Sequence, residues 1–242
     1  MNGVDVKVKF SRSKDEFCLM GTAADNNKLK IISAALYVKK VTVSPAVKIG
    51  HAQALLSATA KYPIERVCVK TFSMPAGGRV CTQENLFLGP LPKCVVIGMV
   101  DNDAYTGSYV KNPFNFKHYD AEFISMYVNG VQYPSKPFLP NFGDDNAVRE
   151  FYSLVQSTGK QMKDQAMVID RTEYLHGYTL YGFNMTPDED GGQHLSLVNS
   201  GNMRLELRFR NPLPNTVNVI VYATFDNIVE INQRRNVLID YY

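Results

Sequence analysis

The chain has 242 residues, of which 45% are hydrophobic and 20% charged, and its formal net charge is +3. This composition excludes intrinsic disorder, because it supplies ample apolar material for a packed core, and the length suits one large domain or two small ones. The 26 basic and 23 acidic residues are spread along the chain. Proteins that bind nucleic acid usually concentrate basic residues on one face, and no such concentration occurs in this sequence. We therefore expect no direct, sequence-specific contact with nucleic acid.

The cysteines indicate a reducing environment. No CxxC pair occurs among the four cysteines, which are Cys18, Cys68, Cys81 and Cys94. Residues 1–20 alternate between charged and apolar side chains, which is unlike a signal peptide. We therefore expect synthesis inside a host cell, in the cytoplasm or the nucleus. No apolar run approaches the roughly 20 residues that a helix needs to span a bilayer, so no membrane contact is expected.

The chain is expected to open with β-structure. Residues 4–10 alternate apolar and charged side chains, which is typical of a half-buried strand. Two β-rich runs follow within residues 28–43. Ser44 and Pro45 then have the residue types of an N-cap and a first helical position, which predicts a short helix over residues 45–58. Its expected inward face consists of Val47, Ala52, Leu55 and Leu56.

The middle of the chain predicts strands and one hairpin. Strands are expected at 66–73 and 93–100, and the second is apolar without interruption. Such a strand is usually buried on both faces, so we expect it at the centre of a sheet with Val96 facing the core. Residues 118–128 alternate again. Asn129-Gly130 follows, and this dipeptide is typical of a hairpin with a type I′ turn.

Two short helices are expected between the later strands. Asp144 or Asp145 has the residue type of an N-cap, and the helix after it would end at Gly159. Asp170 and Glu173 have the spacing of a capping box, which predicts a second, shorter helix. The apolar residues of the first helix are Val148, Phe151, Tyr152 and Val155.

The remaining segments complete a β-sandwich. Further strands are expected at 178–184, 202–209, 216–225, 228–231 and 236–239. Many short strands joined by loops rich in Pro and Gly predict a mainly β protein, an antiparallel jelly-roll β-sandwich with two or three short inserted helices.

A weak internal repeat suggests how the chain is divided. Residues 4–10 and 203–209 share one pattern of alternating apolar and charged side chains, and each is followed by a loop and further β-rich segments. We therefore expect residues 1–43 to be the closing strands of a preceding jelly roll that is mostly absent, and residues 44–242 to be a second jelly-roll domain.

No motif predicts catalysis or metal binding. Asp101 and Asp103 begin an apparent calcium loop, but Thr106 and Asn112 occupy the positions where an EF-hand needs Gly and Glu, so an ordinary turn is expected. The acidic loop at 188–190 would hold a cation only loosely. The histidines show no zinc-site spacing; they are His51, His118, His176 and His194. With no nucleophile elbow or phosphate loop, we expect no catalytic residue, metal or cofactor.

The aromatic run at residues 111–119 has two interpretations. Phe114, Phe116 and Tyr119 lie beside Lys111 and Lys117, an arrangement that could stack nucleic-acid bases. Aromatic residues also dominate buried cores and subunit interfaces. We favour packing.

Several stretches resemble one protein family. They are Glu-Asn-Leu-Phe-Leu-Gly at 84–89, Val-Asp-Asn-Asp-Ala-Tyr at 100–105, Lys-Asn-Pro-Phe-Asn-Phe-Lys-His-Tyr at 111–119, Gly-Tyr-Thr-Leu at 177–180, Met-Arg-Leu-Glu-Leu-Arg-Phe at 203–209, Thr-Val-Asn-Val-Ile-Val-Tyr-Ala at 216–223 and Phe-Asp-Asn at 225–227. They resemble the hexon-like, double jelly-roll major capsid protein of Polinton/Maverick elements and adintoviruses. The resemblance covers essentially the whole chain, as the C-terminal part of that protein.

The resemblance implies a structural role in a virion. The family's chains form homotrimeric capsomers that tile an icosahedral shell, so the expected partners are further copies of the chain, neighbouring capsomers and other capsid proteins. This chain is short for the family, whose first roll would precede residue 1. Candidate subunit contacts are Phe114, Phe116, Tyr119, Val148, Phe151 and Tyr152. The alternatives are a jelly-roll ligand-binding module, such as a lectin, and a hydrolase with its site in the loops.

Overall fold

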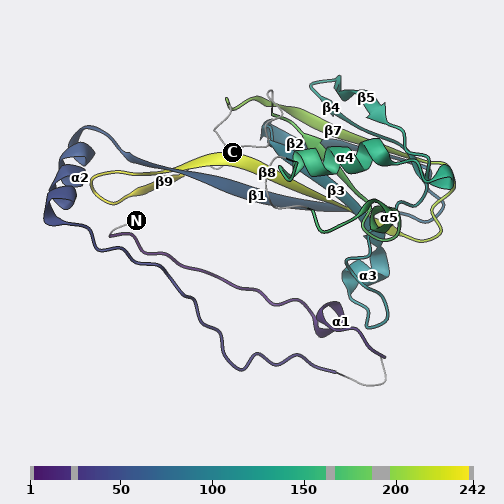
Figure 1. Ribbon diagram of the computed structural model, residues 1–242, viewed down its shortest axis with the longest axis horizontal. Helices are drawn as coiled ribbons and strands as arrows, with labels where there is room; N and C mark the ends of the chain where they lie inside the picture. The colour runs from purple at the N-terminus through teal and green to yellow at the C-terminus, as the bar shows by residue number, and fades with distance from the viewer. Residues whose placement is uncertain (1–2, 23–26, 162–166, 187–196, 240–242) are drawn as a thin grey trace.

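The computed structural model describes residues 3–22, 27–161, 167–186 and 197–239. Within these residues two antiparallel sheets pack face to face around one core (Figure 1). The strands are β1 (Ala60–Met74), β2 (Val80–Pro90), β3 (Cys94–Asp101), β4 (Ala121–Val128), β5 (Val131–Phe138), β6 (Leu180–Asn184), β7 (Ser200–Phe209), β8 (Val217–Ile231) and β9 (Val237–Ile239). The helices are α1 (Asp15–Cys18), α2 (Pro45–Ser57), α3 (Asn102–Thr106), the 3-10 helix η2 (Phe142–Asp144), α4 (Val148–Ser157) and α5 (Arg171–Leu175).

The strand order identifies the fold. One sheet has the order β1-β8-β3-β6, with β9 pairing to the distal end of β8, and the other has the order β2-β7-β4-β5. Apart from β9, the strands pair in a nested order, in which β1 lies beside β8, β2 beside β7, β3 beside β6 and β4 beside β5. This arrangement of antiparallel strands is the jelly roll. The predicted fold class, a mainly β jelly-roll sandwich with short helices, is confirmed.

The strand β3 occupies the expected central position, between β8 and β6. Val95, Ile97 and Met99 are fully buried and face the opposite sheet. Val96 is only half-buried on the outer face, so the expectation that it faces the core is wrong. Side chains alternate across a strand, and the outer face of β3 is covered by a helix and a loop instead of a second sheet.

Several local motifs form as their residues predict. Asn129 and Gly130 have φ values of 52° and 83°, as a type I′ turn requires, and they join β4 to β5. At α5, the backbone N–H of Glu173 donates to the Asp170 carboxylate at 2.7 Å, and the Glu173 carboxylate accepts from the Asp170 N–H at 3.1 Å. Both the hairpin and the capping box are confirmed.

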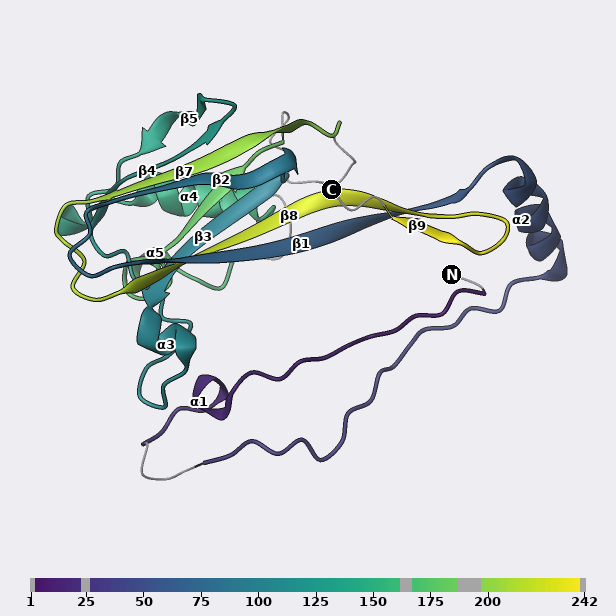
Figure 2. The ribbon, with the colours of Figure 1, turned by 180° about the vertical axis from the view of Figure 1, so that it is seen from behind.

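The N-terminal arm, residues 3–43, departs from the prediction. Its described residues form no strand at 4–10 or within 28–43, and most of the apolar side chains of these two segments are exposed, although Val4 is half-buried. Figures 1 and 2 show the arm as two extended segments separated from the sheets. A strand needs a neighbour for its backbone groups, and none of the described strands pairs with these segments. The assignment of residues 1–43 to a preceding roll remains a prediction.

The helix α2 forms where expected but does not bury the expected face. Val47 and Leu56 are exposed, and only Leu55 is half-buried. Ser44 is at the N-cap position, although its side chain makes no capping hydrogen bond. Figure 2 explains the exposure, because α2 lies beyond the sandwich, at the end of the long ribbon formed by β1, β8 and β9.

Other boundaries differ because pairing extends the strands. The expected strands at 216–225 and 228–231 are one continuous strand, β8, and its partner β1 begins at Ala60. The strand β2 is not apparent from the pattern, since polar residues interrupt it where its pairing to β7 shifts between Gln83 and Phe87. The expected turn after β3 is the helix α3, and α4 has Ala147 at its N-cap in place of an aspartate.

Candidate interaction surfaces

Phe116, in the aromatic run, packs inside the molecule. Its N–H donates to the carbonyl of Gly177 at 2.8 Å, and its carbonyl accepts from the N–H of Thr179 at 3.1 Å. Its ring lies against the outer face of β3, where a Cβ placed on Gly98 would meet Phe116 Cδ1 at 2.7 Å. The glycine therefore permits the close approach of the ring, and Phe116 fixes the loop to the sheet.

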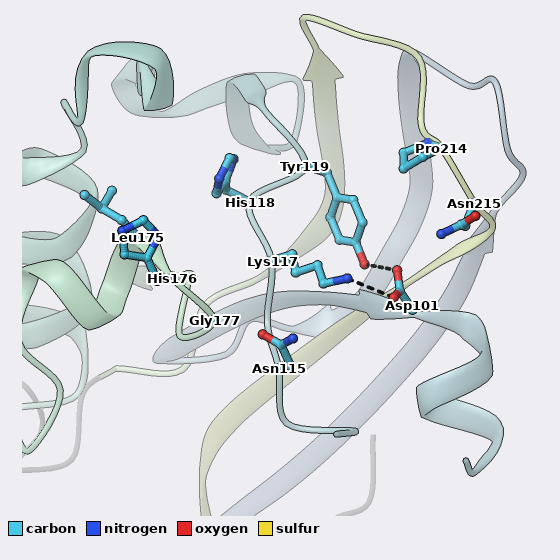
Figure 3. A pocket seen from close by; sticks show the side chains of 10 residues that line it. All are labelled: Asp101, Asn115, Lys117, His118, Tyr119, Leu175, His176, Gly177, Pro214 and Asn215. Carbon is cyan, nitrogen blue, oxygen red and sulfur yellow. Dashed lines mark hydrogen bonds and ion pairs between the residues drawn. The ribbon is translucent and has the colours of Figure 1, made fainter. Parts of the chain in front are cut away.

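Tyr119 also has an internal partner (Figure 3). Its hydroxyl donates to Asp101 Oδ1 at 2.7 Å, and Lys117 Nζ donates to Asp101 Oδ2 at 2.9 Å. Burial acts to raise the pKa of Asp101, but the hydrogen bonds from Lys117 and Tyr119 outweigh burial and hold the pKa below its ordinary value. Burial, together with this bond, raises the pKa of Tyr119 far above its ordinary value. The cluster anchors the loop to the end of β3.

Phe114 is the residue of this run that faces solvent, with 60% of its surface exposed. Its ring meets Phe17 edge to face, with the centroids 5.9 Å apart. Phe17 belongs to α1, so this contact joins the arm to the roll. The rest of the ring is available to another molecule.

The helix α4 packs on β6. As in the aromatic run, one of its candidate contact residues is turned inward and the others are exposed. Ser153 Oγ donates to the Gly182 carbonyl at 2.8 Å, which fastens the helix to the strand. Phe151 turns inward and meets the ring of Tyr174 edge to face at 5.3 Å. Val148 and Tyr152 are about half exposed, on the opposite side. The role of the six candidate residues in subunit contact remains a prediction; Phe114, Val148 and Tyr152 are the three that are exposed.

A pocket of about 400 Å³ opens beside the Asp101 cluster (Figure 3). His118 lines it, stacks on Phe142 with centroids 4.1 Å apart, and accepts at Nδ1 from the Asp120 N–H. Burial lowers the pKa of His118, and His176 acts in the same direction, against the opposing effect of Asp120. In the part of the chain that the structure describes, no three His, Cys, Asp or Glu side chains gather as metal ligands. The acidic loop at 188–190 lies outside the described residues.

A third surface, on the outer face of β1 and β8, was not predicted. Val69 is 55% exposed, and it lies directly across from Tyr222, which is also exposed. Val67 extends this apolar row along β1. The strand expected at residues 66–73 carries apolar side chains on both of its faces. No feature of the sequence distinguishes the inner face from the outer one.

Comparisons with known proteins give distant relatives. No family model matches the chain. An uncharacterized protein of Caenorhabditis elegans is 27% identical over 183 residues, which are 74% of this chain and 44% of the relative, so the chain spans less than half of the curated protein that it matches.

No described helix is long and apolar enough to cross a membrane.

The similar solved structures are viral capsid proteins. The PBCV-1 virus capsid matches with a TM-score of 0.46 and 12% identity, covering 76% of this chain and 52% of that one. The Sputnik virophage structure has the same TM-score and identity, covering 76% and 39%. The mavirus major capsid protein matches with a TM-score of 0.42 and 11% identity, covering 76% and 41%.

Proposed function

We propose that this chain is a structural protein of the viral capsid type, which associates into trimeric capsomers of an icosahedral shell. The observation that carries the proposal is the set of apolar side chains exposed around a complete jelly roll, on three separate elements. They are Phe114 in the loop after α3, Val148 and Tyr152 on α4, and Val67, Val69 and Tyr222 on the outer sheet face.

These side chains are not needed to complete the core. The core cluster already joins both sheets through fully buried residues such as Ile97, Leu205 and Val221. Single exposed apolar residues are ordinary on a protein surface, but groups of them mark sites of association. A subunit that contacts several neighbours needs more than one such group, and the three elements supply them. The sequence resemblance to double jelly-roll capsid proteins points to the same role, with the virion as its location.

Size-exclusion chromatography coupled to light scattering tests the proposal. We expect a species of three times the 27.2 kDa chain mass, strengthened by sulfate because apolar burial drives association. Tyr152→Lys should weaken the trimer, whereas Val131→Lys at the exposed hairpin tip is the matched control and should not. A monomer that persists throughout the micromolar range would contradict the proposal.

The ligand-binding alternative would rest on the pocket beside Asp101. Both oxygens of that carboxylate already accept hydrogen bonds, from Tyr119 and Lys117, so a sugar would have to replace an internal bond. A glycan array measures this directly. Specific binding that Tyr119→Phe abolishes would favour the alternative over a purely structural role.

A further inference from the structure

One long edge of the sandwich is open. The strand β1 pairs along its whole length with β8, from Ala60 opposite Ile231 to Met74 opposite Val217, and it ends the sheet on its other side. Among the described residues no strand pairs with that outer edge. A strand at the edge of a sheet presents a row of free N–H and C=O groups, which is a template for another strand.

The open edge is only partly protected, by the charges of Arg66 and Lys70 on the inner face of β1 and by one proline. Its proline, Pro63, is near the α2 end, and no proline follows it within β1. The outer face carries the exposed Val67 and Val69, and the inner face carries Cys68 and Phe72, which are only half-buried. A strand added here would meet apolar side chains on both of its faces.

The arm contains a segment with matching properties. Residues 27–43 are extended but form no strand, and they include five apolar residues in succession, at 34–38. Tyr37 is 94% exposed, and Leu36 and Val38 on either side of it are exposed as well. Because successive side chains of a strand point to opposite faces, such a run requires cover on both faces. Pairing with β1 would place the side chains of one face beside Val67 and Val69, and those of the other face beside Cys68 and Phe72.

The charges of the two segments are complementary. No Asp or Glu occurs from residue 27 to residue 64, and Lys39 and Lys40 follow the apolar run. Near the α2 end of the β1 edge, the side chain of Glu65 is 60% exposed and that of Glu230 is 32% exposed. Glu65 lies on β1 itself and pairs with Lys93, whereas Glu230 lies one strand further in, on β8, and pairs with Lys61. The exposed Glu65 carboxylate is therefore the one beside the free edge, where the lysines of an added strand would be favourable.

We propose that residues 27–43 of one copy add as a strand to the free edge of β1 in a second copy. This inference rests on the proposed capsomer function and specifies its contact, since passing each arm to the next copy closes a ring. The partner is a second copy because α2 prevents the arm from pairing with its own β1 at the helix. Its 13 residues hold its ends about 20 Å apart, whereas paired strands lie about 4.8 Å apart. Figures 1 and 2 show the arm and β1 joined to opposite ends of α2.

Proline substitutions test the backbone pairing. The double variant Val38→Pro/Val41→Pro removes two N–H donors from the proposed strand, and we expect the midpoint concentration for association to rise at least about tenfold, equivalent to about 1.4 kcal/mol. The matched control is Val6→Pro/Val8→Pro, in the other extended segment of the arm, which should leave that midpoint unchanged. Neither segment forms strands in the structure, so both variants should keep the parent melting temperature at protein concentrations below those at which the parent associates.

Cross-linking between two distinguishable copies identifies the partner. One tagged copy carries Tyr37→Cys and one untagged copy carries Val69→Cys, both in a Cys18→Ser background because Cys18 is exposed. We expect a bismaleimide to join tagged to untagged chains, and the background protein alone should give no such product. Joining only when both cysteines are in one chain would show that the arm folds back and would overturn the inference.

The outcomes separate this inference from the proposed function. A trimer that survives the Val38→Pro/Val41→Pro change, with no cross-link between copies, overturns the arm exchange and leaves the capsomer intact. A parent protein that remains monomeric overturns both. Amide hydrogen exchange gives a further readout, since residues 31–43 should become protected as the protein concentration rises.

Discussion

Residues 4–10 and 203–209 have almost the same pattern of alternating apolar and charged side chains, yet they have different structures. The second segment belongs to β7, which lies between β2 and β4, and Phe209 is 2% exposed. The first segment is extended without a partner strand, and the corresponding Phe10 is 82% exposed. The alternating pattern predicts which side chains would lie on the apolar face of a strand and which on the charged face. Only neighbouring strands make it a strand, because they bond its backbone and cover one face.

Truncating the corresponding phenylalanines should give the largest contrast. Phe209→Ala removes a ring from the core and should lower the free energy of unfolding by about 3–5 kcal/mol. Phe10→Ala should change it by less than about 0.5 kcal/mol, because its ring contacts mostly solvent. Chemical denaturation of both variants measures the difference. Equal losses would show that the arm is packed in the folded protein.

Glycines offer a second contrast between the roll and the exposed helix. A Cβ on Gly182 would lie 2.8 Å from the Leu154 Cα and 2.0 Å from Ser157 Oγ, so Gly182→Ala should push α4 from β6 at a cost of about 2–3 kcal/mol. Gly50, in α2, has no atom within 4 Å of that position. Gly50→Ala should be neutral or stabilise by up to about 1 kcal/mol, through helix propensity. Thermal unfolding compares the two, and a neutral Gly182→Ala would contradict the close packing of α4.

Two aspartates give the smallest contrast, through pH. The pKa of Asp101 lies below its ordinary value of 3.8, so its stabilisation is present above that pH and is lost as the pH falls through the folded-state pKa. Tyr119→Phe removes one of its hydrogen bonds and should cost about 1 kcal/mol at pH 7, with the difference from the parent shrinking below pH 3.8.

The control for this measurement is in the arm. Hydrogen bonds from Arg12 and from the Leu29 N–H also hold the pKa of Asp15 low, and both of these donors belong to the arm. Asp15→Asn should leave the melting temperature unchanged from pH 3 to pH 7. A fall as large as that of Tyr119→Phe would mean that the arm contributes to the stability of the roll.

The local features were the most predictable part of the fold. Asn129-Gly130 predicted the hairpin because positive φ is accessible to both residues, and Asp170 with Glu173 predicted the start of α5 because each caps the other. The strand β2 was missed, since its bulge interrupts the alternation. Of the candidate contact residues, the sequence identified the aromatic run but did not show that Phe116 packs on Gly98 while Phe114 faces solvent.

By itself the sequence determined the Asn129-Gly130 turn, the capping box of α5 and the central strand β3, because backbone preferences and an unbroken apolar run act over a few residues. Only the tertiary structure decided which alternating segments are strands, which face of β1 is inside, and that α2 lies beyond the sandwich. Those outcomes depend on partners far away in the chain. The strand β1 exists because β8, more than 140 residues later, bonds it from end to end, whereas residues 4–10 have no such partner among the residues that the structure describes.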